Sequence, residues 1–131
     1  MKKLSIILPT YNERDNVDRI YNAITEVITQ LELDYEIIFV DDDSPDGTID
    51  IVKQLHSSDS NVKYILMSNR FGEQKCLMAG LDYADGDAII TMDADLEHPP
   101  NYILQMVSEW ENGSEIVVMK RSTTSHNKLF K

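Results

Sequence analysis

Five apolar runs rich in β-branched residues recur along this chain at nearly even intervals. They begin at Leu4, Tyr35, Val62, Ala88 and Glu115, so that successive starts lie 31, 27, 26 and 27 residues apart. Within each run the apolar residues are continuous rather than alternating with polar ones. Continuous apolar strands are typical of a parallel sheet that is covered on both faces. This feature constrains the fold strongly, because parallel strands need a long crossover segment between them.

The segments between these runs carry apolar residues at helical spacing. From Val17 onward they recur at i, i+3, i+4 and i+7, which predicts a helix with one buried face. In chain order, the predicted apolar positions are Val17, Ile20, Tyr21, Ile24, Val27, Ile28 and Leu31, then Ile49, Val52 and His56, then Leu77, Gly80, Leu81 and Ala84, and last Ile103, Met106, Val107 and Trp110. Strands separated by single helices predict an α/β fold, with a Rossmann-like, mostly parallel sheet flanked by helices on both faces.

Polar motifs follow the predicted strands at their carboxyl ends. In open sheets of this kind, ligands bind outside those ends, where the strand order reverses. A strand order of 3-2-1-4 would bring together the loops after the first and fourth strands, which read PTYNE (residues 9 to 13) and DADLEHPP (residues 93 to 100). The motifs therefore fall where this fold would place a site.

Length and charge narrow the class of ligand. The chain has 131 residues, enough for one domain with a substantial core, and its formal net charge is −11. This charge argues against a nucleic-acid backbone or an anionic lipid as the main partner of the domain. An anionic ligand would need a metal ion, a helix N-terminus or a few well-placed cations. Cys76 is the only cysteine and no run has the length of a transmembrane helix, so we expect a cytoplasmic domain without a disulfide.

The first loop lacks the glycines of a dinucleotide site. The motif PTYNE stands where a dinucleotide fold carries G-x-G-x-x-G, so NAD and FAD are disfavoured. It places an aromatic ring and a carboxylate, Tyr11 and Glu13, at a strand end. A simpler interpretation is a helix cap, with Asn12 or Asp15 opening the next helix, and both interpretations remain open.

Three consecutive aspartates, Asp41, Asp42 and Asp43, follow the second run. Ser44 and Asp46, which come next, are explained as turn and N-cap residues. The aspartates are not explained in this way, because adjacent carboxylates at a strand end repel one another. We expect base edges, ribose hydroxyls or water to occupy their acceptor positions. A solvated acidic turn is the alternative.

Carboxylates at alternate positions, Asp93, Asp95 and Glu97, follow the fourth run. Hard oxygen ligands suit Mg²⁺ or Mn²⁺, and two or three of them leave coordination positions for a diphosphate. Such a cation stabilises a diphosphate leaving group as its bond breaks. His98 is a rival ligand, although a lone histidine before two prolines is more often a turn or packing residue. The Pro-Pro pair at residues 99 and 100 suits the start of the next helix.

Cations occur in two further places. Arg70 and Lys75 lie in a loop that enters a helix, where they would offset the acidic crevice and meet phosphate. A solvated helix start is the alternative. Lys120 and Arg121 close the fifth run, where the planar fork of an arginine is suited to clamp a phosphate and a surface cation is equally consistent.

Taken together, these motifs resemble the nucleotide-sugar-binding region of family 2 glycosyltransferases with the GT-A fold. The resemblance rests on PTYNE, VDDDSPDGT, NRFGEQKCLMAGLDYADGD, DADLEHPP and WENGSEIVVMKR, and it spans residues 4 to 121. Within the family, the chain is most similar to the polyprenyl-phosphate glycosyltransferases, such as dolichyl-phosphate mannose synthases and undecaprenyl-phosphate glucosyltransferases. SPDGT, HPP after the aspartates and the W-x-x-G-x-x-x-V spacing carry this narrower similarity.

The resemblance implies a role for each matching residue. Asp42 would contact the base. Asp95 would be the main metal ligand, with Asp93 near the ribose or metal and Glu97 within reach of the metal. Arg121 would face the donor diphosphate or the acceptor phosphate, so the catalytic residues would be Asp95 and Arg121. The other residues implied to meet the nucleotide-sugar are Pro9, Thr10, Tyr11, Glu13, Arg70, Lys75 and Ala94.

Three departures from the family pattern bear on these roles. Glu97 stands where the subgroup usually has Gln, which would add charge at the metal. The loop at residues 69 to 72 reads N-R-F-G where relatives commonly read R-N-F-G, which puts the usual role of Arg70 in question. Thr124 stands where a second arginine is common, which puts the acceptor phosphate contact in question.

The resemblance thus implies an inverting glycosyltransferase donor domain over residues 1 to 131. It would bind a UDP- or GDP-sugar with Mg²⁺ or Mn²⁺ and, within a longer protein at the cytoplasmic face of a membrane, transfer the sugar to a polyprenyl phosphate. We expect the sequence, which stops at Lys131, to be truncated before the acceptor-binding segment and any membrane helices, and to transfer little alone. The alternatives are transfer to a saccharide hydroxyl in cell-surface polysaccharide synthesis, a nucleotidyltransferase, and a flavodoxin-like or receiver module that binds Mg²⁺.

Overall fold

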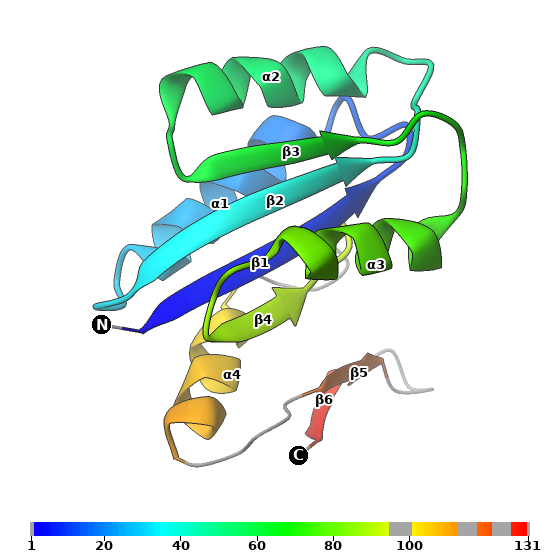
Figure 1. Cartoon of the computed structure of the whole chain (residues 1–131). Helices are drawn as coiled ribbons and strands as arrows, with labels where there is room; N and C mark the ends of the chain where they lie inside the picture. The colour runs from blue at the N-terminus through cyan, green and yellow to red at the C-terminus, as the bar shows by residue number, and fades with distance from the viewer. Residues whose placement is uncertain (1, 95–100, 113–117, 122–126, 131) are drawn as a thin grey trace.

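A computed structural model of the chain describes residues 2–94, 101–112, 118–121 and 127–130, the last two ranges by their strand pairing alone. Figure 1 shows the elements, which are, in chain order, β1 (Lys3–Thr10), α1 (Val17–Ile28), β2 (Asp34–Asp41), α2 (Thr48–Ser58), β3 (Val62–Leu66), α3 (Glu73–Tyr83), β4 (Ala88–Thr91), α4 (Tyr102–Glu111), β5 (Val118–Arg121) and β6 (Asn127–Phe130).

The first four strands form one parallel sheet in the order β3-β2-β1-β4 (Figure 1). In its register, Ile6 of β1 lies between Ile37 of β2 and Ile90 of β4. The sheet therefore has the order 3-2-1-4, the one that would bring the loops after the first and fourth strands together. Because the chain returns to the far side of β1 after β3, the strand order reverses beside β1, which is where open parallel sheets form a ligand crevice.

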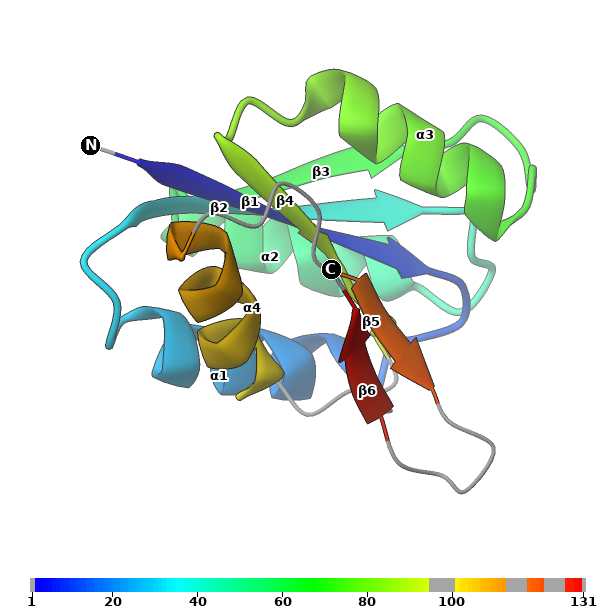
Figure 2. The same cartoon turned by 90° about the horizontal axis from the view of Figure 1, so that it is seen from below.

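Helices cover both faces of the sheet, as predicted. α1, α2 and α4 lie on one face and α3 on the other (Figure 2). On the three-helix face, Leu4, Ile6 and Phe39 of the sheet are buried in one cluster with Ile20 and Ile24 of α1. Full burial of one such side chain contributes about 1.5–3 kcal/mol to stability. This cluster is the larger of the two cores, and it fixes the sheet on which the polar loops stand.

The predicted apolar face of α1 is correct. Val17, Ile20, Ile24 and Ile28 have no exposed surface. At 12 residues, α1 is the longest helix in the described ranges. None of the helices in these ranges is long and apolar enough to cross a lipid bilayer.

The buried apolar face that was predicted for α3 is correct in part. Leu81 is 47% exposed, so its predicted burial is wrong, whereas Cys76 and Gly80 are buried. A Cβ on Gly80 would lie 2.6 Å from Cγ2 of Ile7, so α3 approaches the sheet closely at this glycine. Cys76 and Gly80 share a helix face at i and i+4, and Leu81 lies about 100° further round. Close packing at Gly80 therefore turns Leu81 outward.

The fifth apolar run does not extend the parallel sheet. Among the described residues, β5 pairs with β6 alone, antiparallel, and Arg121 lies opposite Asn127. The α/β class is confirmed, but the expectation of a fifth parallel strand is wrong. An antiparallel partner is reached through a short connection, whereas a parallel one needs a crossover of a dozen residues or more. Only five residues separate β5 from β6.

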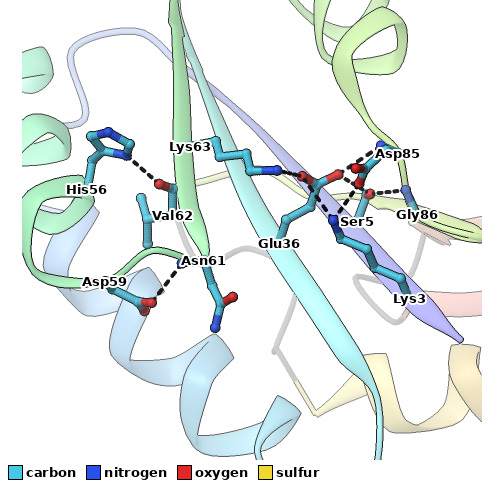
Figure 3. A network of polar contacts seen from close by, with 10 residues as sticks. All are labelled: Lys3, Ser5, Glu36, His56, Asp59, Asn61, Val62, Lys63, Asp85 and Gly86. Carbon is cyan, nitrogen blue, oxygen red and sulfur yellow. Dashed lines mark hydrogen bonds and ion pairs between the residues drawn. The ribbon is translucent and has the colours of Figure 1, made fainter. Parts of the chain in front are cut away.

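Glu36 is buried in the amino half of β2 (Figure 3). Its carboxylate accepts hydrogen bonds from Ser5 Oγ (2.6 Å), Lys63 Nζ (2.6 Å) and the N–H of Asp85 (2.9 Å). Lys3 Nζ lies 3.8 Å from Glu36 Oε1 and 2.6 Å from Asp85 Oδ1. These contacts join β1, β2, β3 and the turn before β4 at one end of the sheet. We call Glu36 with Lys3, Ser5, Lys63 and Asp85 the amino-end cluster.

Hydrogen bonds keep the carboxylate of the amino-end cluster ionised. Burial raises the pKa of Glu36, but hydrogen bonds from Lys63, Ser5 and Asp85 outweigh it and lower the pKa from 4.5 to about 2. The hydrogen bond and charge of Asp85, with the charge of Glu36, raise the pKa of Lys3. Opposite charges within this distance favour each other's ionised forms. The cluster therefore stays charged and paired near neutral pH.

Candidate functional site

A pocket of about 220 Å³ opens at the carboxyl ends of β1, β2 and β4. Its walls come from the loop after β1, the end of β2, the start of α3 and the residues that follow β4. The lining residues are Pro9, Thr10, Tyr11, Glu13, Asp42, Arg70, Gly72, Glu73, Cys76, Asp93 and Ala94. Segments that are far apart in the sequence thus meet at the predicted edge of the sheet.

Backbone hydrogen bonds hold the loop after β1. Asn12 has a positive φ of 56°, and its N–H donates to Ser44 Oγ (2.9 Å). The carbonyl of Glu13 accepts a hydrogen bond from the N–H of Asn16 (2.9 Å), and α1 begins one residue later. The interpretation of Asn12 or Asp15 as the helix cap is wrong. The N-cap position is Asn16, whose side chain makes no capping hydrogen bond.

The loops after β1 and β2 are tied to each other. The N–H of Glu13 donates to Thr48 Oγ1 (3.1 Å), and the N–H of Arg14 donates to Asp46 Oδ2 (3.3 Å). Asp46 also accepts the N–H of Thr48 (3.0 Å), the first residue of α2, but the N-cap position is Gly47, so the prediction of Asp46 as an N-cap is wrong. Burial opposes ionisation of Asp46, but hydrogen bonds from Thr48 and Arg14 outweigh it and lower the pKa of Asp46. The pocket wall formed by Glu13 is therefore anchored from α2.

The first of the three aspartates supports the loops internally. Asp41 has no exposed surface, and it accepts hydrogen bonds from Thr10 Oγ1 (2.9 Å), Ser44 Oγ (2.8 Å) and the N–H of Ser44 (2.9 Å). Asp43 is exposed and has a positive φ of 59°. Of the three aspartates, only Asp42 lines the pocket.

Asp42 connects the end of β2 to the start of α3. It is 4% exposed, and its two oxygens accept hydrogen bonds from the N–H groups of Phe71 (2.7 Å) and Gly72 (3.0 Å). A carboxylate beside a helix N-terminus is stabilised by the unpaired N–H groups there. The expectation that ligand or water takes all these acceptor positions is therefore corrected, because backbone donors of the protein occupy two of them.

The thiol of Cys76 lies buried beside Asp42. Cys76 has no exposed surface and lines the same pocket. Burial, followed by the charge and the hydrogen bond of Asp42, raises the pKa of the Cys76 thiol to about 12. The thiol is therefore neutral near pH 7.

Arg70 covers the ring of Tyr11. Its guanidinium carbon lies 3.8 Å from the ring centroid, in a cation–π contact. Such a contact contributes about 0.5–1 kcal/mol at an exposed site. Lys75 is not among the residues that line the pocket, and its Nζ lies 5.5 Å from the centroid of the Phe71 ring. The structure therefore brings Arg70, but not Lys75, to the predicted site.

Asp93 and Ala94 line the pocket directly after β4. The N–H of Met92 donates to the carbonyl of Ile7 (3.0 Å), which holds this segment beside β1. Asp93 is half-buried and Ala94 is buried. The other predicted metal ligands, Asp95 and Glu97, and also His98, lie outside the described residues, as does the Pro-Pro pair.

The possible metal ligands among the described residues of the pocket fit a hard divalent cation in part. Within the described residues, no group of three or more acidic, histidine or cysteine side chains could hold a metal ion. Asp93 is the one predicted ligand that these residues include. The pocket lining carries the carboxylates of Glu13, Asp42, Glu73 and Asp93, and oxygen ligands of this kind suit Mg²⁺ and Mn²⁺.

Arg121 is the last residue of β5, outside the four-stranded sheet. The backbone places it at the end of a two-stranded hairpin, opposite Asn127. The predicted contact of its side chain with a phosphate stays a prediction.

Three lining residues had no predicted role: Gly72, Glu73 and Cys76. They lie at or just before the start of α3, which packs on the sheet through the row formed by Cys76 and Gly80. The i, i+4 spacing of these two residues was a usable signal. The pattern starting at Leu77 missed it because a single cysteine next to polar residues does not stand out as apolar.

Comparison with known proteins identifies the kind of chain that carries this site. The sequence profile described as "Glycosyl transferase family 2" matches residues 5–131. A dolichol-phosphate mannosyltransferase of Pyrococcus furiosus is 40% identical over 119 residues, which cover 91% of this chain and 33% of that protein. A prophage bactoprenol glucosyl transferase homolog of Escherichia coli is 36% identical over 123 residues, which cover 94% of this chain and 40% of that protein.

A solved structure shares the fold. The mannosyltransferase PcManGT of Pyrobaculum calidifontis, in complex with GDP-Man and Mn²⁺, superposes with a TM-score of 0.70 at 22% identity. The match covers 93% of this chain and 35% of that one. The chain therefore spans well under half the length of the relatives and of this structure.

Proposed function

The chain belongs to glycosyl transferase family 2, and from this premise we propose that it forms the donor-binding part of an inverting enzyme that transfers a sugar from a UDP- or GDP-sugar to a polyprenyl phosphate. The observation that carries the proposal is the pocket. β1, β2 and β4 end at one crevice, and eight of the residues that the family resemblance assigns to the donor site line it. Relatives named for dolichol phosphate and bactoprenol support the acceptor class.

The described residues would hold the nucleoside end of the donor. Asp42 would accept a hydrogen bond from the base, because its carboxylate is fixed by backbone donors and faces the pocket. Tyr11 and Pro9 would line the base, and Arg70 would supply positive charge at the pocket wall. Glu13, anchored through its N–H to α2, would line the nucleotide from the other side.

Asp93, with Asp95 and Glu97, would hold Mg²⁺ or Mn²⁺ at the end of β4. Bound there, the cation would take up negative charge on the departing diphosphate. An oxygen of the acceptor phosphate would attack the anomeric carbon from the face opposite the nucleotide, and the bond to the diphosphate would break with its electron pair. A phosphate acceptor is already ionised near pH 7, so no residue is needed as its base. Arg121 would contribute a positive charge at the diphosphate or the acceptor.

Calorimetric titration tests this proposal. We expect a UDP- or GDP-sugar to bind in the presence of Mn²⁺ and to bind more weakly with EDTA. Tyr11→Ala is expected to weaken binding roughly 10-fold, because stacking on an aromatic ring contributes about 1–3 kcal/mol. Tyr83→Ala is the matched control, since Tyr83 is 72% exposed and does not line this pocket. Binding of neither nucleotide-sugar by the folded protein would contradict the proposal, and transfer to a saccharide but not to a polyprenyl phosphate would contradict its acceptor.

A further inference from the structure

Tyr11 lies between two residues that are bonded to the end of β2 and the loop after it. On one side, Thr10 Oγ1 donates a hydrogen bond to Asp41 Oδ1 (2.9 Å). On the other side, the N–H of Asn12 donates to Ser44 Oγ (2.9 Å). The backbone position of Tyr11 is therefore set through both of its neighbours in the chain.

The hydroxyl of Ser44 joins these two contacts. Its oxygen accepts the N–H of Asn12, and its proton is donated to Asp41 Oδ1 (2.8 Å), the oxygen that also accepts the hydroxyl of Thr10. Asp41 has no exposed surface, so this bridge ends on a group that the fold holds in place. The N–H of Ser44 donates separately to Asp41 Oδ2 (2.9 Å). That backbone bond is enough for the turn predicted here, and the hydroxyl bridge is additional to it.

The bridge holds Asn12 in an uncommon backbone conformation. Its φ is 56°, in the left-handed region, which non-glycine residues adopt rarely and asparagine more readily than most. Such a conformation persists where surrounding contacts fix it. Without the bond to Ser44 Oγ, Asn12 is free to return to a negative φ, and that rotation displaces Tyr11, the residue before it.

The ring of Tyr11 takes part in a contact that depends on its position. The guanidinium carbon of Arg70 lies 3.8 Å from the ring centroid, and both residues line the pocket. Arg70 is held close to this place as well, because the N–H of the next residue, Phe71, donates to Asp42 Oδ1 (2.7 Å). Both members of the pair are therefore positioned from the carboxyl end of β2.

We propose that Ser44 is a positioning residue that holds the Tyr11 ring in place for the base of the nucleotide. The inference rests on the proposed function, in which Tyr11 lines the base. Ser44 is not among the residues that line the pocket, so it acts through the N–H of Asn12 and not on the ligand. A side chain that is ordered before the ligand arrives loses less freedom on binding, which favours affinity.

A measurement without ligand tests the geometry. The ring current of Tyr11 shifts the NMR signals of the Arg70 side chain that covers it. Ser44→Ala removes the hydroxyl but keeps the N–H that forms the turn, so these signals are expected to move toward their positions in Tyr11→Ala. Ser44→Thr keeps a hydroxyl and is expected to leave them close to their wild-type positions. Unchanged Arg70 signals in Ser44→Ala, or an equal movement in Ser44→Thr, would overturn the inference and leave the proposed function standing.

Calorimetric titration with UDP and GDP in Mn²⁺ tests the effect on the ligand. For the nucleotide that binds, Ser44→Ala is expected to weaken binding roughly 3- to 10-fold. In a Tyr11→Ala background the same substitution is expected to have no further effect, because residues that act through one another are not additive. An equal loss in both backgrounds would show that Ser44 does not act through Tyr11 and would refute the inference alone. Binding of neither nucleotide by the wild type would refute the proposed function and the inference together.

Two further variants complete the experiment. Ser57→Ala is the matched control, since Ser57 is an exposed serine of α2 whose hydroxyl donates to the carbonyl of Gln54 (2.7 Å), and it is expected to change neither readout. Urea denaturation of each variant is measured first. If Ser44→Ala does not fold, Ser44→Cys takes its place with the same expected outcomes, because a thiol is a weak hydrogen-bond partner of similar size.

Discussion

The two ends of the sheet hold buried carboxylates in opposite ways. In the amino-end cluster, Glu36 lies 2.6 Å from Lys63 Nζ and 3.8 Å from Lys3 Nζ. At the carboxyl end, Asp41 and Asp42 are also buried, but their hydrogen-bond donors are hydroxyls and backbone N–H groups. In the part of the chain that the structure describes, no ion pair joins either aspartate to a lysine or arginine.

This difference indicates which buried carboxylate stabilises the fold and which one is available to a ligand. Pairing with two lysines offsets the charge of Glu36 and joins three strands, so its acceptor capacity is used within the fold. Neutral donors position Asp42 but leave its negative charge uncompensated, which favours a cation or a hydrogen-bond donor from a ligand. The partners of a buried acid therefore indicate its role better than its burial does.

The largest expected effect is on stability at the amino end. Glu36→Ala removes the acceptor of Ser5 Oγ and of the Asp85 N–H, and it removes the partner of Lys63. Each lost hydrogen bond costs about 1 kcal/mol, so the free energy of unfolding is expected to fall by about 3 kcal/mol in urea denaturation. Glu26→Ala on the exposed face of α1 is the control, and a loss no larger than in this control would show that the cluster does not fasten the strands.

At the carboxyl end, we expect a substitution to lower nucleotide-sugar affinity and to leave stability nearly unchanged. Asp93→Asn keeps the shape of the side chain but removes its charge, so calorimetry is expected to show nucleotide-sugar affinity in Mn²⁺ falling roughly 100-fold. The free energy of unfolding is expected to change by less than about 0.5 kcal/mol, because no partner in the fold depends on this carboxylate among the described residues. Asp82→Asn, exposed on α3, is the control. Loss of stability with unchanged affinity would reverse the comparison.

A smaller loss of stability is expected from the turn that closes the amino-end cluster. A Cβ on Gly86 would lie 2.5 Å from Ser5 Oγ and 2.7 Å from the Ser5 nitrogen. Gly86→Ala should therefore push the turn away from Ser5 and destabilise the fold by about 1–3 kcal/mol, measured by urea denaturation. Nucleotide-sugar affinity is expected to stay unchanged, and a loss of affinity would mean that the two ends are coupled.

The last expected effect is a gradual loss of stability as the pH is lowered. Because Glu36 has a pKa of about 2 in the folded chain and 4.5 as its ordinary value, only the unfolded chain binds this proton between those pH values. Its stabilising contribution is full above about pH 4.5 and falls as the pH drops toward 2, by on the order of 1 kcal/mol per pH unit. In Glu36→Gln this part of the pH dependence should disappear. An unchanged acid transition in the variant would assign it to other carboxylates.

The sequence predicts the sheet well because its signals are local. Continuous apolar runs identify β1 to β4, and the helical spacing identifies the buried face of α1. The burial of α3 and the pairing of β5 escape such patterns. Gly80 allows α3 to approach Ile7 closely, and β5 pairs with β6. Both features depend on contacts between segments of the folded chain, which a local pattern does not contain.

The sequence also predicts where the candidate site lies, but not the partners of its carboxylates. Motifs at strand ends locate the loops, and the strand order brings Tyr11, Asp42 and Asp93 to one pocket. The sequence does not distinguish Asp41 from Asp42, because donors from distant parts of the chain set their difference: Thr10 for Asp41, and Phe71 and Gly72 for Asp42. It also gives no role to Cys76.

The order of apolar runs and polar motifs by itself determined the α/β fold and the edge of the sheet where a ligand would bind, because periodicity and strand ends are properties of the chain. The tertiary structure decided which carboxylates remain available there. Asp41 accepts three hydrogen bonds from Thr10 and Ser44, and Asp42 accepts two from Phe71 and Gly72. Lysines of neighbouring strands pair with Glu36. Acceptor capacity depends on which donors lie within about 3 Å, and only the folded chain fixes those distances.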